Sequence, residues 1–465
     1  MSTFSGLNAA TTALWANRRG LDVTGQNIAN VNTEGYSRQR VDLQAIGGSA
    51  VPAFFSTGSG IGQGVNADDV MRIRDVFLEG RGHTEHANLT QLVAETDSYE
   101  LIEQAFREPG NTGIQKMLSE VWSGWQDVAN NPDDSAARGQ VLKRMETLAG
   151  GLHFSQQQLG GQWAQTRENL AVLVDDVNAA AENIATLNVA IQRATQSGLP
   201  ANDLADQRDV LAMQLADQVG ASVRHGKDGV LDVSVGGMSL VSGGSATKFE
   251  VAGTIDPDQT AGDPLRVVTA VGDFNVRVGG TAGGQLNALN AIVPSYRGQL
   301  DTIASSLATA MNTAHGEGYD LTGATGGALF GTADGSPITA ANITVMITDP
   351  DRIAASGVAG AGNLDRANAD RIAQLAHTAG IDEGYRKMIV ELGVQSAVSQ
   401  RNFDIQSSIT TTVDAARESV AGVNLDEELT NMLSYQQAYA AAGRMVTAID
   451  EALDVLINRT GLVGR

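Results

Sequence analysis

The chain of 465 residues contains no cysteine, which excludes disulfides, thiolate metal sites, iron–sulfur clusters and cysteine nucleophiles. It has no apolar run near the ~18 residues that a membrane-spanning helix needs, and its N-terminus lacks the basic start and apolar stretch of a signal peptide. The 31 basic residues against 53 acidic ones give a net charge of −22, so a surface built to bind nucleic-acid phosphates is not expected. These absences favour a soluble, acidic protein, and the length favours about three domains of roughly 150 residues each.

Both ends of the chain contain an apolar repeat with the spacing of a helix that packs against another helix. Near the N-terminus the repeat comes every seven residues and consists of Leu7, Leu14, Leu21 and Ile28. Near the C-terminus the spacing alternates between four and three, and the apolar members are Leu425, Leu429, Met432, Tyr439, Val446, Leu453 and Ile457. Such narrow stripes suit a partner helix, although periodicity alone is also compatible with two amphipathic helices that pack on their own domain.

The middle of the chain is predicted to be helical on both sides of a strand-rich segment. Apolar spacing of three and four predicts helices over residues 89–106, 114–128, 163–196, 284–311 and 364–376, and from 381 into the C-terminal repeat. Asn131 and Pro132 form a helix-start signal. Asn202 is the expected cap of a further helix, which ends at Gly220.

Antiparallel strands are predicted from residue 221, where apolar residues begin to alternate with polar ones. Two such runs are Leu231-Val233-Val235 and Phe274-Val276-Val278, and a further strand is expected over residues 343–347. The predicted fold class is therefore mainly α with a β insertion. The terminal helices pair as a coiled-coil-like inner domain, long helices form a middle bundle, and a small antiparallel β domain lies outermost. The expected domains are residues 1–60 with 417–465, 61–220 with 281–416, and 221–280.

No residues in the sequence have the spacing of a catalytic, metal or cofactor site. His83 and His86 are a close histidine pair, but a zinc-binding helix needs His-Glu-x-x-His, so we expect them in a solvated polar segment. The run Gly58–Gly64 lacks the last glycine of the dinucleotide-binding fingerprint, and Lys227 is followed by Asp228 rather than by the Ser or Thr of a phosphate-binding loop. We therefore expect no catalytic residue, no metal and no cofactor.

A recognisable motif follows the N-terminal helix. Residues 27–39 read Asn-Ile-Ala-Asn-Val-Asn-Thr-Glu-Gly-Tyr-Ser-Arg-Gln, which resembles the Ala-Asn-x-x-Thr-x-Gly-Tyr signature of bacterial flagellar rod, hook and hook-associated proteins. Glu34 stands where that family often has proline. Asn30 and Gly35 permit a sharp exit from the helix, and Tyr36 is expected to anchor the extended segment that follows. The C-terminus resembles the same superfamily through residues 423–428, Val-Asn-Leu-Asp-Glu-Glu, and 435–439, Tyr-Gln-Gln-Ala-Tyr.

Within this superfamily the chain resembles the hook-associated protein 1 family. Residues 204–209, Leu-Ala-Asp-Gln-Arg-Asp, are similar to a Leu-x-Asp-Gln-Arg-Asp segment of that family, and residues 349–356 resemble another of its blocks. Rod and hook proteins instead place mostly β structure after the first helix. The resemblance extends over nearly the whole chain and is weakest over residues 221–280.

The resemblance implies a structural, non-enzymatic protein at the extracellular hook–filament junction of the bacterial flagellum. It implies that the chain is exported unfolded through the flagellar export apparatus and folds its terminal helices on assembly. The implied partners are further copies of the chain in a helical ring, the hook protein, hook-associated protein 3 and a cytoplasmic export chaperone at the C-terminal helix, with no nucleic acid and no membrane span. The expected assembly residues are Leu7, Leu14, Leu21, Ile28, Asn30, Gly35, Tyr36, Leu425, Leu429, Met432, Tyr439, Val446 and Leu453.

Three alternatives stay open at this point. The first is another axial protein, either a hook protein, which should be mainly strand between its termini, or a junction protein of the third type. The second is a soluble chaperone or adhesin that holds a ligand with its β domain and has well-ordered termini. The third is an enzyme whose dispersed residues form a concave polar cluster with perturbed acidity.

Overall fold

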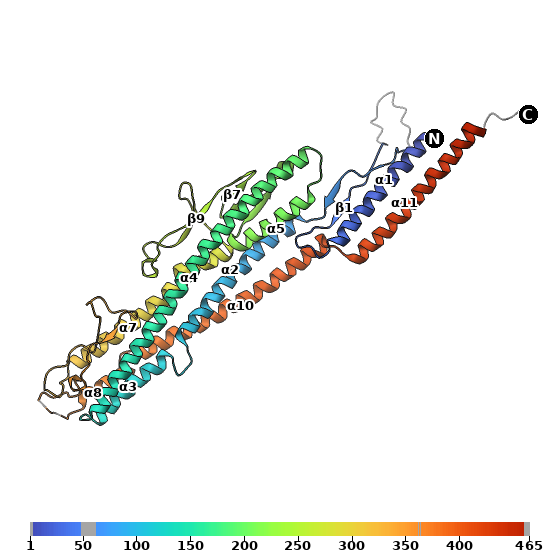
Figure 1. Cartoon of the computed structure of the whole chain (residues 1–465). Helices are drawn as coiled ribbons and strands as arrows, with labels where there is room; N and C mark the ends of the chain where they lie inside the picture. Colours follow the sequence, from blue (N-terminus) through green and yellow to red (C-terminus); the bar gives the residue numbers. More distant parts are fainter. Residues whose placement is uncertain (1–2, 48–61, 361, 363, 460–465) are drawn as a thin grey trace, which may run out of the picture.

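The computed structural model describes residues 3–47, 62–360, 362 and 364–459 of the chain. Its helices run side by side along one long axis, and the two terminal helices extend from one end of the resulting rod (Figure 1). The first described residue of α1 (Thr3–Ala29) and the last residue of α11 (Leu425–Asp454) lie at this end, whereas helix α8 (Ala367–Ala373) lies at the opposite end of the rod. The predicted fold class, mainly α with a β insertion, is confirmed.

The terminal helices α1 (Thr3–Ala29) and α11 (Leu425–Asp454) form an antiparallel pair. An arm, which we define as residues 39–47 and 62–72, returns along α1. In this arm β1 (Gln39–Val41) pairs with β4 (Val70–Arg72), and β2 (Gln44–Ala45) pairs with β3 (Val65–Asn66). Val41 and Ala67 of the arm pack with Ala16 of α1 in a small apolar cluster. The expected domain boundary between residues 60 and 61 lies outside the described residues.

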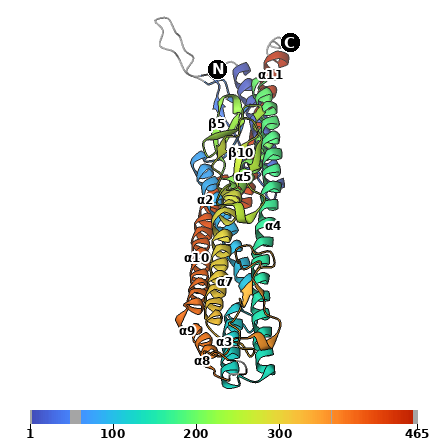
Figure 2. The same cartoon turned by 90° about the vertical axis from the view of Figure 1, so that its left-hand side faces the viewer.

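The rest of the rod is a bundle of long helices around a shared apolar core. Its main helices are α2 (Val76–Phe106), α3 (Ile114–Asn130), α4 (Ser135–Gln196), α5 (Asn202–Val219), α6 (Gly280–Asn287), α7 (Val293–Gly316) and α10 (Ile381–Ala421). Helix α7 lies between α4 and α10 along the rod (Figure 2). Trp125, Trp163 and Tyr385 are buried in the core, and the indole N–H of Trp163 donates to the carbonyl of Leu289 at 2.9 Å. This hydrogen bond satisfies the polar end of a side chain that is otherwise packed among apolar groups.

Helix α4 begins earlier than the sequence pattern predicts. It is one continuous helix of 62 residues, roughly 90 Å long at about 1.5 Å per residue, whereas the pattern predicts a long helix from residue 163. The predicted start at Asn131 and Pro132 is wrong, because these residues lie before the helix. Asp134 is the N-cap, and its carboxylate accepts from the backbone N–H of Ala136 at 2.8 Å. Two potential caps stand close together here, and the helix begins after the second.

The prediction for Asn202 is also wrong. It is the first residue of α5, whose N-cap position is Ala201, and its side-chain amide donates to the carbonyl of Val70 at 3.0 Å. The predicted end of this helix is confirmed, because Gly220 adopts a left-handed conformation with φ 69° and caps α5.

The β insertion packs against α4 as two small antiparallel sheets. The first has the order β5 (Ser222–His225), β6 (Leu231–Val235), β7 (Met238–Ser242) and β8 (Ser245–Ala246). The second has the order β11 (Asn275–Val276), β10 (Arg266–Thr269) and β9 (Phe249–Ala252). The alternation predicted for β6 is confirmed, because its apolar residues are buried. The run predicted over 274–278 is shorter in the structure, and Phe274 is 61% exposed outside the strand.

Short elements close the end of the bundle that lies away from the terminal pair. Strand β12 (Phe330–Gly331) pairs with β13 (Thr344–Val345), so the strand predicted over 343–347 is present but shorter. The helix predicted over 364–376 is split into α8 and α9 (Leu375–Thr378), and the one over 284–311 is present as α6 and α7. Helix α10 runs past the expected domain boundary at residue 416 and ends at Ala421. Residues 422–424 are not helical and connect it to α11.

Candidate assembly site

Two glycines of α1 lie at its contact with α11. Gly6 lies against Ile449, and a Cβ atom added to Gly20 would lie 2.7 Å from a ring carbon of Tyr435. Seven residues after Gly20, Asn27 donates from its amide to a carboxylate of α11 at 3.0 Å. Glycine therefore lets the two helices approach closely, along a line one position away from the predicted leucines but with the same spacing.

None of the predicted apolar assembly residues is buried in the structure. Half-buried members are Leu7, Leu14, Leu21, Ile28, Met432, Val446 and Leu453. Leu425, Leu429 and Tyr439 are 45%, 51% and 42% exposed. The exposed residues that the pattern missed are Phe4, Trp15, Leu433 and Met445. Within the described part of the pair, the buried apolar side chains are those of alanines, so the large ones stay partly open to solvent along its length.

The residues of the N-terminal motif fold back onto the start of α11. Asn27 is buried, and its Oδ1 accepts from the Tyr36 hydroxyl at 2.8 Å and from the Gln39 N–H at 2.9 Å. Its Nδ2 donates to the Gln39 carbonyl at 2.9 Å and to Glu428 at 3.0 Å. The other oxygen of Glu428 accepts from Arg38 at 2.8 Å. We call this set of five residues, Asn27, Tyr36, Arg38, Gln39 and Glu428, the clamp.

Arg38 supplies the charge that balances the buried carboxylate of the clamp. The Glu428 side chain is 3% exposed and that of Arg38 is 19% exposed, and Arg38 also donates to the more exposed Glu427 at 2.8 Å. The backbone N–H of Arg38 donates to the carbonyl of Ala421 at the end of α10, at 2.8 Å. The two sequence motifs, residues 27–39 and 423–428, thus meet in space. Sequence spacing could not pair them, because a contact across some 400 residues leaves no local pattern.

Three of the predicted assembly residues shape the exit from α1. Asn30 donates to the carbonyl of Gln26 at 3.0 Å and so closes the last turn. Gly35 has φ +75°, and a Cβ atom there would overlap the side chain of Val210 on α5, so the position requires glycine. Burial and the nearby carboxylate of Asp206 raise the pKa of Tyr36 to about 12. Tyr36 therefore stays protonated and keeps its hydroxyl available as a donor to the clamp.

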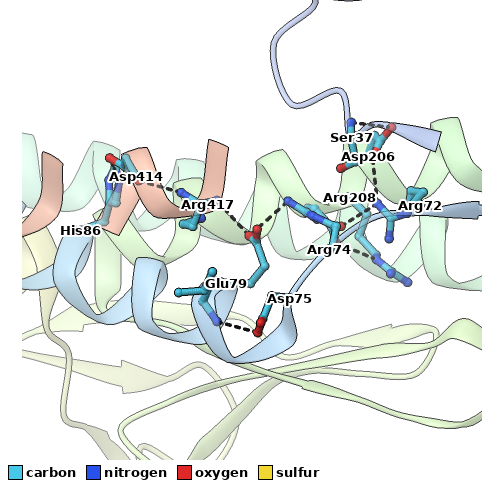
Figure 3. Close-up of polar contacts among 12 residues, drawn as sticks. Ser37, Arg72, Arg74, Asp75, Glu79, His86, Asp206, Arg208, Asp414 and Arg417 are labelled. Carbon is cyan, nitrogen blue, oxygen red and sulfur yellow. Dashed lines mark hydrogen bonds and ion pairs between the residues drawn. The ribbon is translucent and has the colours of Figure 1, made fainter. Parts of the chain in front are cut away.

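A network of charged side chains lies where the terminal pair meets the rest of the rod (Figure 3). Arg72, at the end of the arm, donates to Asp206 and to Asp209 of α5, both at 2.8 Å. Arg74 pairs with Asp209 and donates to Glu79 of α2 at 3.1 Å. The side chains of Arg72, Asp206 and Asp209 are 16%, 9% and 11% exposed. At such burial each charge depends on its partner, because removing one would leave the other poorly solvated.

The same network continues along α2 and α10. Glu79 accepts from Arg417 at 2.9 Å, and Arg417 also donates to Asp414 at 2.8 Å. The ring of His86 lies between two carboxylates, with Nε2 at 2.9 Å from Asp414 and Nδ1 at 3.2 Å from Asp217. The hydrogen bond to Asp217 raises the pKa of His86. Three helices, α2, α5 and α10, are therefore tied together by charge at this level of the rod.

The prediction of a solvated segment around His83 and His86 is wrong. Both residues lie in α2, and His83 is 7% exposed. Burial lowers the pKa of His83 to about 4, so the ring is neutral at pH 7. Among the residues that the structure describes, no group of three or more histidine, aspartate or glutamate side chains is placed to hold a metal ion.

A groove of about 970 Å³ lies between α1, the arm and the loop before α5. The described residues of its lining include Trp15, Arg18, Arg19 and Asp22, and none of them is a histidine, serine or lysine that could form a catalytic arrangement. Of the run Gly58–Gly64, residues 58–61 lie outside the described part of the chain. No described helix has the length and apolarity needed to cross a bilayer. The arrangement holds the two chain ends together and presents apolar side chains outward.

Three family models match consecutive parts of the chain. One described as a flagella basal body rod protein matches residues 7–36, and one described as the helical domain of flagellar hook-associated protein FlgK matches residues 99–330. A third, described as the C-terminal part of the flagellar basal body rod FlgEFG proteins, matches residues 415–459. The first and third matches fall on the terminal pair, and the second falls on the helical bundle and the β insertion.

Whole-length relatives agree with these models. The chain is 29% identical to flagellar hook-associated protein 1 of Bacillus subtilis strain 168, over an alignment that covers 100% of both chains. It is 24% identical to the protein of the same name from Escherichia coli strain K12, over 98% of both chains. Among solved structures, the flagellar hook junction protein FlgK from Burkholderia pseudomallei has the same fold, with a TM-score of 0.63 at 16% identity over 74% of this chain and 100% of that one.

Proposed function

Because the chain belongs to the flagellar hook-associated protein 1 family, we propose that it is the structural protein that joins the flagellar hook to the filament outside the cell. Its relatives are flagellar structural proteins, not enzymes. The observation that supports this function best is the terminal pair itself, whose large apolar side chains stay partly exposed along both helices. Surface of this kind is suited to packing against further copies of the same pair in a closed tube.

The terminal helices complete their folding on assembly, from the clamp outward. Away from the clamp, the apolar side chains that the described part of the pair buries completely are alanine-sized, such as Ala10 and Ala442, and its leucines are at most half-buried. A helix gains most of its stability from packing an apolar face, so a pair whose large apolar side chains stay half-exposed is weakly stable alone. Exposed residues such as Leu429 and Leu433 would gain that packing from neighbouring copies.

The chain leaves the cell unfolded through the flagellar export apparatus, and a cytoplasmic chaperone holds α11 before export. The absence of cysteine supports the first step, because no disulfide has to be broken or formed along the route. Binding of α11 by a chaperone is supported by a row of three leucines that are all at least 45% exposed, Leu425, Leu429 and Leu433. An amphipathic helix with such a row is readily bound in an apolar groove.

The other partners are the hook protein and hook-associated protein 3, one on each side of a ring of copies. In this ring the terminal pair, α1 with α11, lines the inside, and the helical bundle from α2 to α10 forms the wall. The β domain, 221–280, faces outward. The elongated shape supports this arrangement, because the terminal pair extends the long axis of the bundle instead of folding back on it (Figure 1).

The test places charge on the exposed apolar row of α11. A strain that lacks the natural protein is complemented with the double variant Leu429→Asp, Leu433→Asp, and junction incorporation and filament growth are scored by electron microscopy and by motility. The matched control is Ser434→Asp with Gln437→Asp, which adds the same charge at exposed polar positions of the same helix. We expect filament growth in the control and none in the leucine variant, with the helicity of the purified full-length variant unchanged. Normal filaments on the leucine variant would refute the proposed interface.

A further inference from the structure

We propose that one face of α5 is an electrostatic latch that sets the angle between two parts of the molecule. The terminal unit comprises residues 3–47, 62–72 and 425–459, and the body comprises the described residues from 76 to 421. Two chain segments connect them, residues 73–75 between β4 and α2 and residues 422–424 between α10 and α11. Both contain extended backbone, with φ and ψ of −107° and 111° at Asp75 and of −72° and 155° at Gly422. Two short extended connections form a hinge unless other contacts fix the angle.

The contacts that fix the angle converge on the first turns of α5. Asn202, Asp206 and Asp209 are spaced four and three residues apart, which puts them on one side of the helix. Asn202 donates to a carbonyl of β4 at 3.0 Å, and Asp206 accepts from the backbone N–H of Ser37 at 3.4 Å. The guanidinium of Arg72 lies between the two aspartates, at 2.8 Å from each. The terminal unit thus rests on this face through hydrogen bonds and ion pairs.

Arg208, which lies between the two aspartates in the motif at residues 204–209, holds α5 to the body. Arg208 is buried, and it donates to Asn188 of α4 at 3.1 Å and to the carbonyl of Gly229 in the β domain at 2.6 Å. The motif at residues 204–209 therefore has two sides. Its aspartates hold the terminal unit, and its arginine fixes the helix that bears them.

The ion pairs and hydrogen bonds described above cross the boundary between the two parts, and each part has its own apolar cluster. The body is built around one large core, whereas the terminal unit has the separate cluster of Ala16, Val41 and Ala67. Opening the latch would expose charged groups to water, so its strength depends on ion pairs more than on buried apolar area. Salt screens charges in water more than it screens pairs that are 9–16% exposed, so high salt should stabilise the exposed charges of the open form and modestly favour opening.

Distance measurements on the full-length chain test this latch directly, because the absence of cysteine allows two spin labels to be placed at chosen sites. One label is attached through Thr430→Cys, close to the clamp on α11, and the other through Asp176→Cys on the exposed side of α4. In this background, Asp206→Asn with Asp209→Asn should raise the ratio of open to docked distances on the order of tenfold. High salt should broaden the distances of the parent chain in the same direction.

The matched control is Asp217→Asn with Asp414→Asn, which removes two carboxylates from the same network without touching the terminal unit. It should keep the docked distance. Reversing one pair, Arg72→Asp with Asp206→Arg, should keep more docked chains than Arg72→Asp alone, with unchanged helicity. Unaltered distances in the Asp206/Asp209 variant, or equal broadening in the control, would overturn the latch. The measurement uses the isolated chain, so its outcome is independent of whether the protein joins hook to filament.

Discussion

Removal of Arg38 should open the clamp, because it leaves a carboxylate buried without its cation. The Glu428 side chain is 3% exposed, and without Arg38 its main partner would be the amide of Asn27 at 3.0 Å. Removing one member of a buried ion pair costs about 3–5 kcal/mol. Each 1.4 kcal/mol is a factor of about ten in an opening equilibrium, so Arg38→Ala should speed exchange of the amides around the clamp roughly 150-fold or more.

A double-mutant cycle of Arg38→Ala, Glu428→Ala and the variant with both changes separates the cost of burying an unpaired charge from the cost of lost packing. Glu428→Ala should cost less than Arg38→Ala, because Arg38 is partly exposed and keeps Glu427 as a partner. In the double variant no buried charge is left, so its amides should exchange more slowly than those of Arg38→Ala alone.

Hydrogen exchange of the isolated chain, followed by mass spectrometry, measures this cycle. The reporting segments are residues 36–41 and 424–432, and the buried core of α4 is the internal reference. Arg40→Ala is the matched control, since Arg40 lies two residues away on β1 and is exposed. Equal exchange in Arg38→Ala and the double variant would refute the buried-charge argument. If none of the variants differs from the parent chain, the clamp is not formed in the single molecule.

Two further predictions concern buried or closely packed positions. Because burial lowers the pKa of His83 to about 4, the folded state takes up its proton at lower pH than the unfolded chain, whose value is 6.5, and stability is lost as pH falls between these values. Urea unfolding measures the free energy of unfolding at pH 7 and at pH 4.5. Between these pH values the parent chain should lose up to about 2.5 kcal/mol more of this free energy than His83→Gln. Equal losses in the two chains would contradict the lowered pKa of His83. Gly20→Ala should impair filament growth by pushing Tyr435 away from α1, whereas Gly25→Ala, where an added Cβ meets nothing within 4 Å, should not. Both changes raise helix propensity by up to about 1 kcal/mol, so motility that falls equally in both would rule out the close contact as the cause.

The sequence was sufficient to predict those helix ends and strand faces that are determined by residues close together in the chain. Gly220 ends α5 because a left-handed cap favours glycine, and the alternation in β6 follows from one face being buried. Where two local signals competed, the sequence could not decide between them. Asn131 and Asp134 are both good caps, and the helix starts after Asp134. The family resemblance identified the architecture, which periodicity alone left open.

The site was harder to predict, because its contacts join distant segments. In α1 two lines share a spacing of seven, one through Leu7 and Leu21 and the other through Gly6, Gly20 and Asn27. Apolarity favours the first as a helix contact, yet the close approach to α11 uses the second. The partners of Asn27 and Arg38 on α11 are some 400 residues away, so no local pattern could indicate the clamp. The aspartates of the latch lie in a recognised motif, but their partner Arg72 has no signal of its own.

The division between polar and apolar contacts follows from the function that we propose. In an ordinary globular domain apolar side chains make the internal contacts and polar ones face outward. Here the clamp and the latch fix the terminal unit through Arg38, Arg72 and buried carboxylates, while residues such as Trp15 and Leu433 stay exposed. A leucine used to hold α1 to α11 within one chain could not also pack against the next copy. Charged contacts at the base of the pair therefore keep its apolar surface available for assembly, and a variant that buried this surface internally should be more stable alone and less able to form the junction.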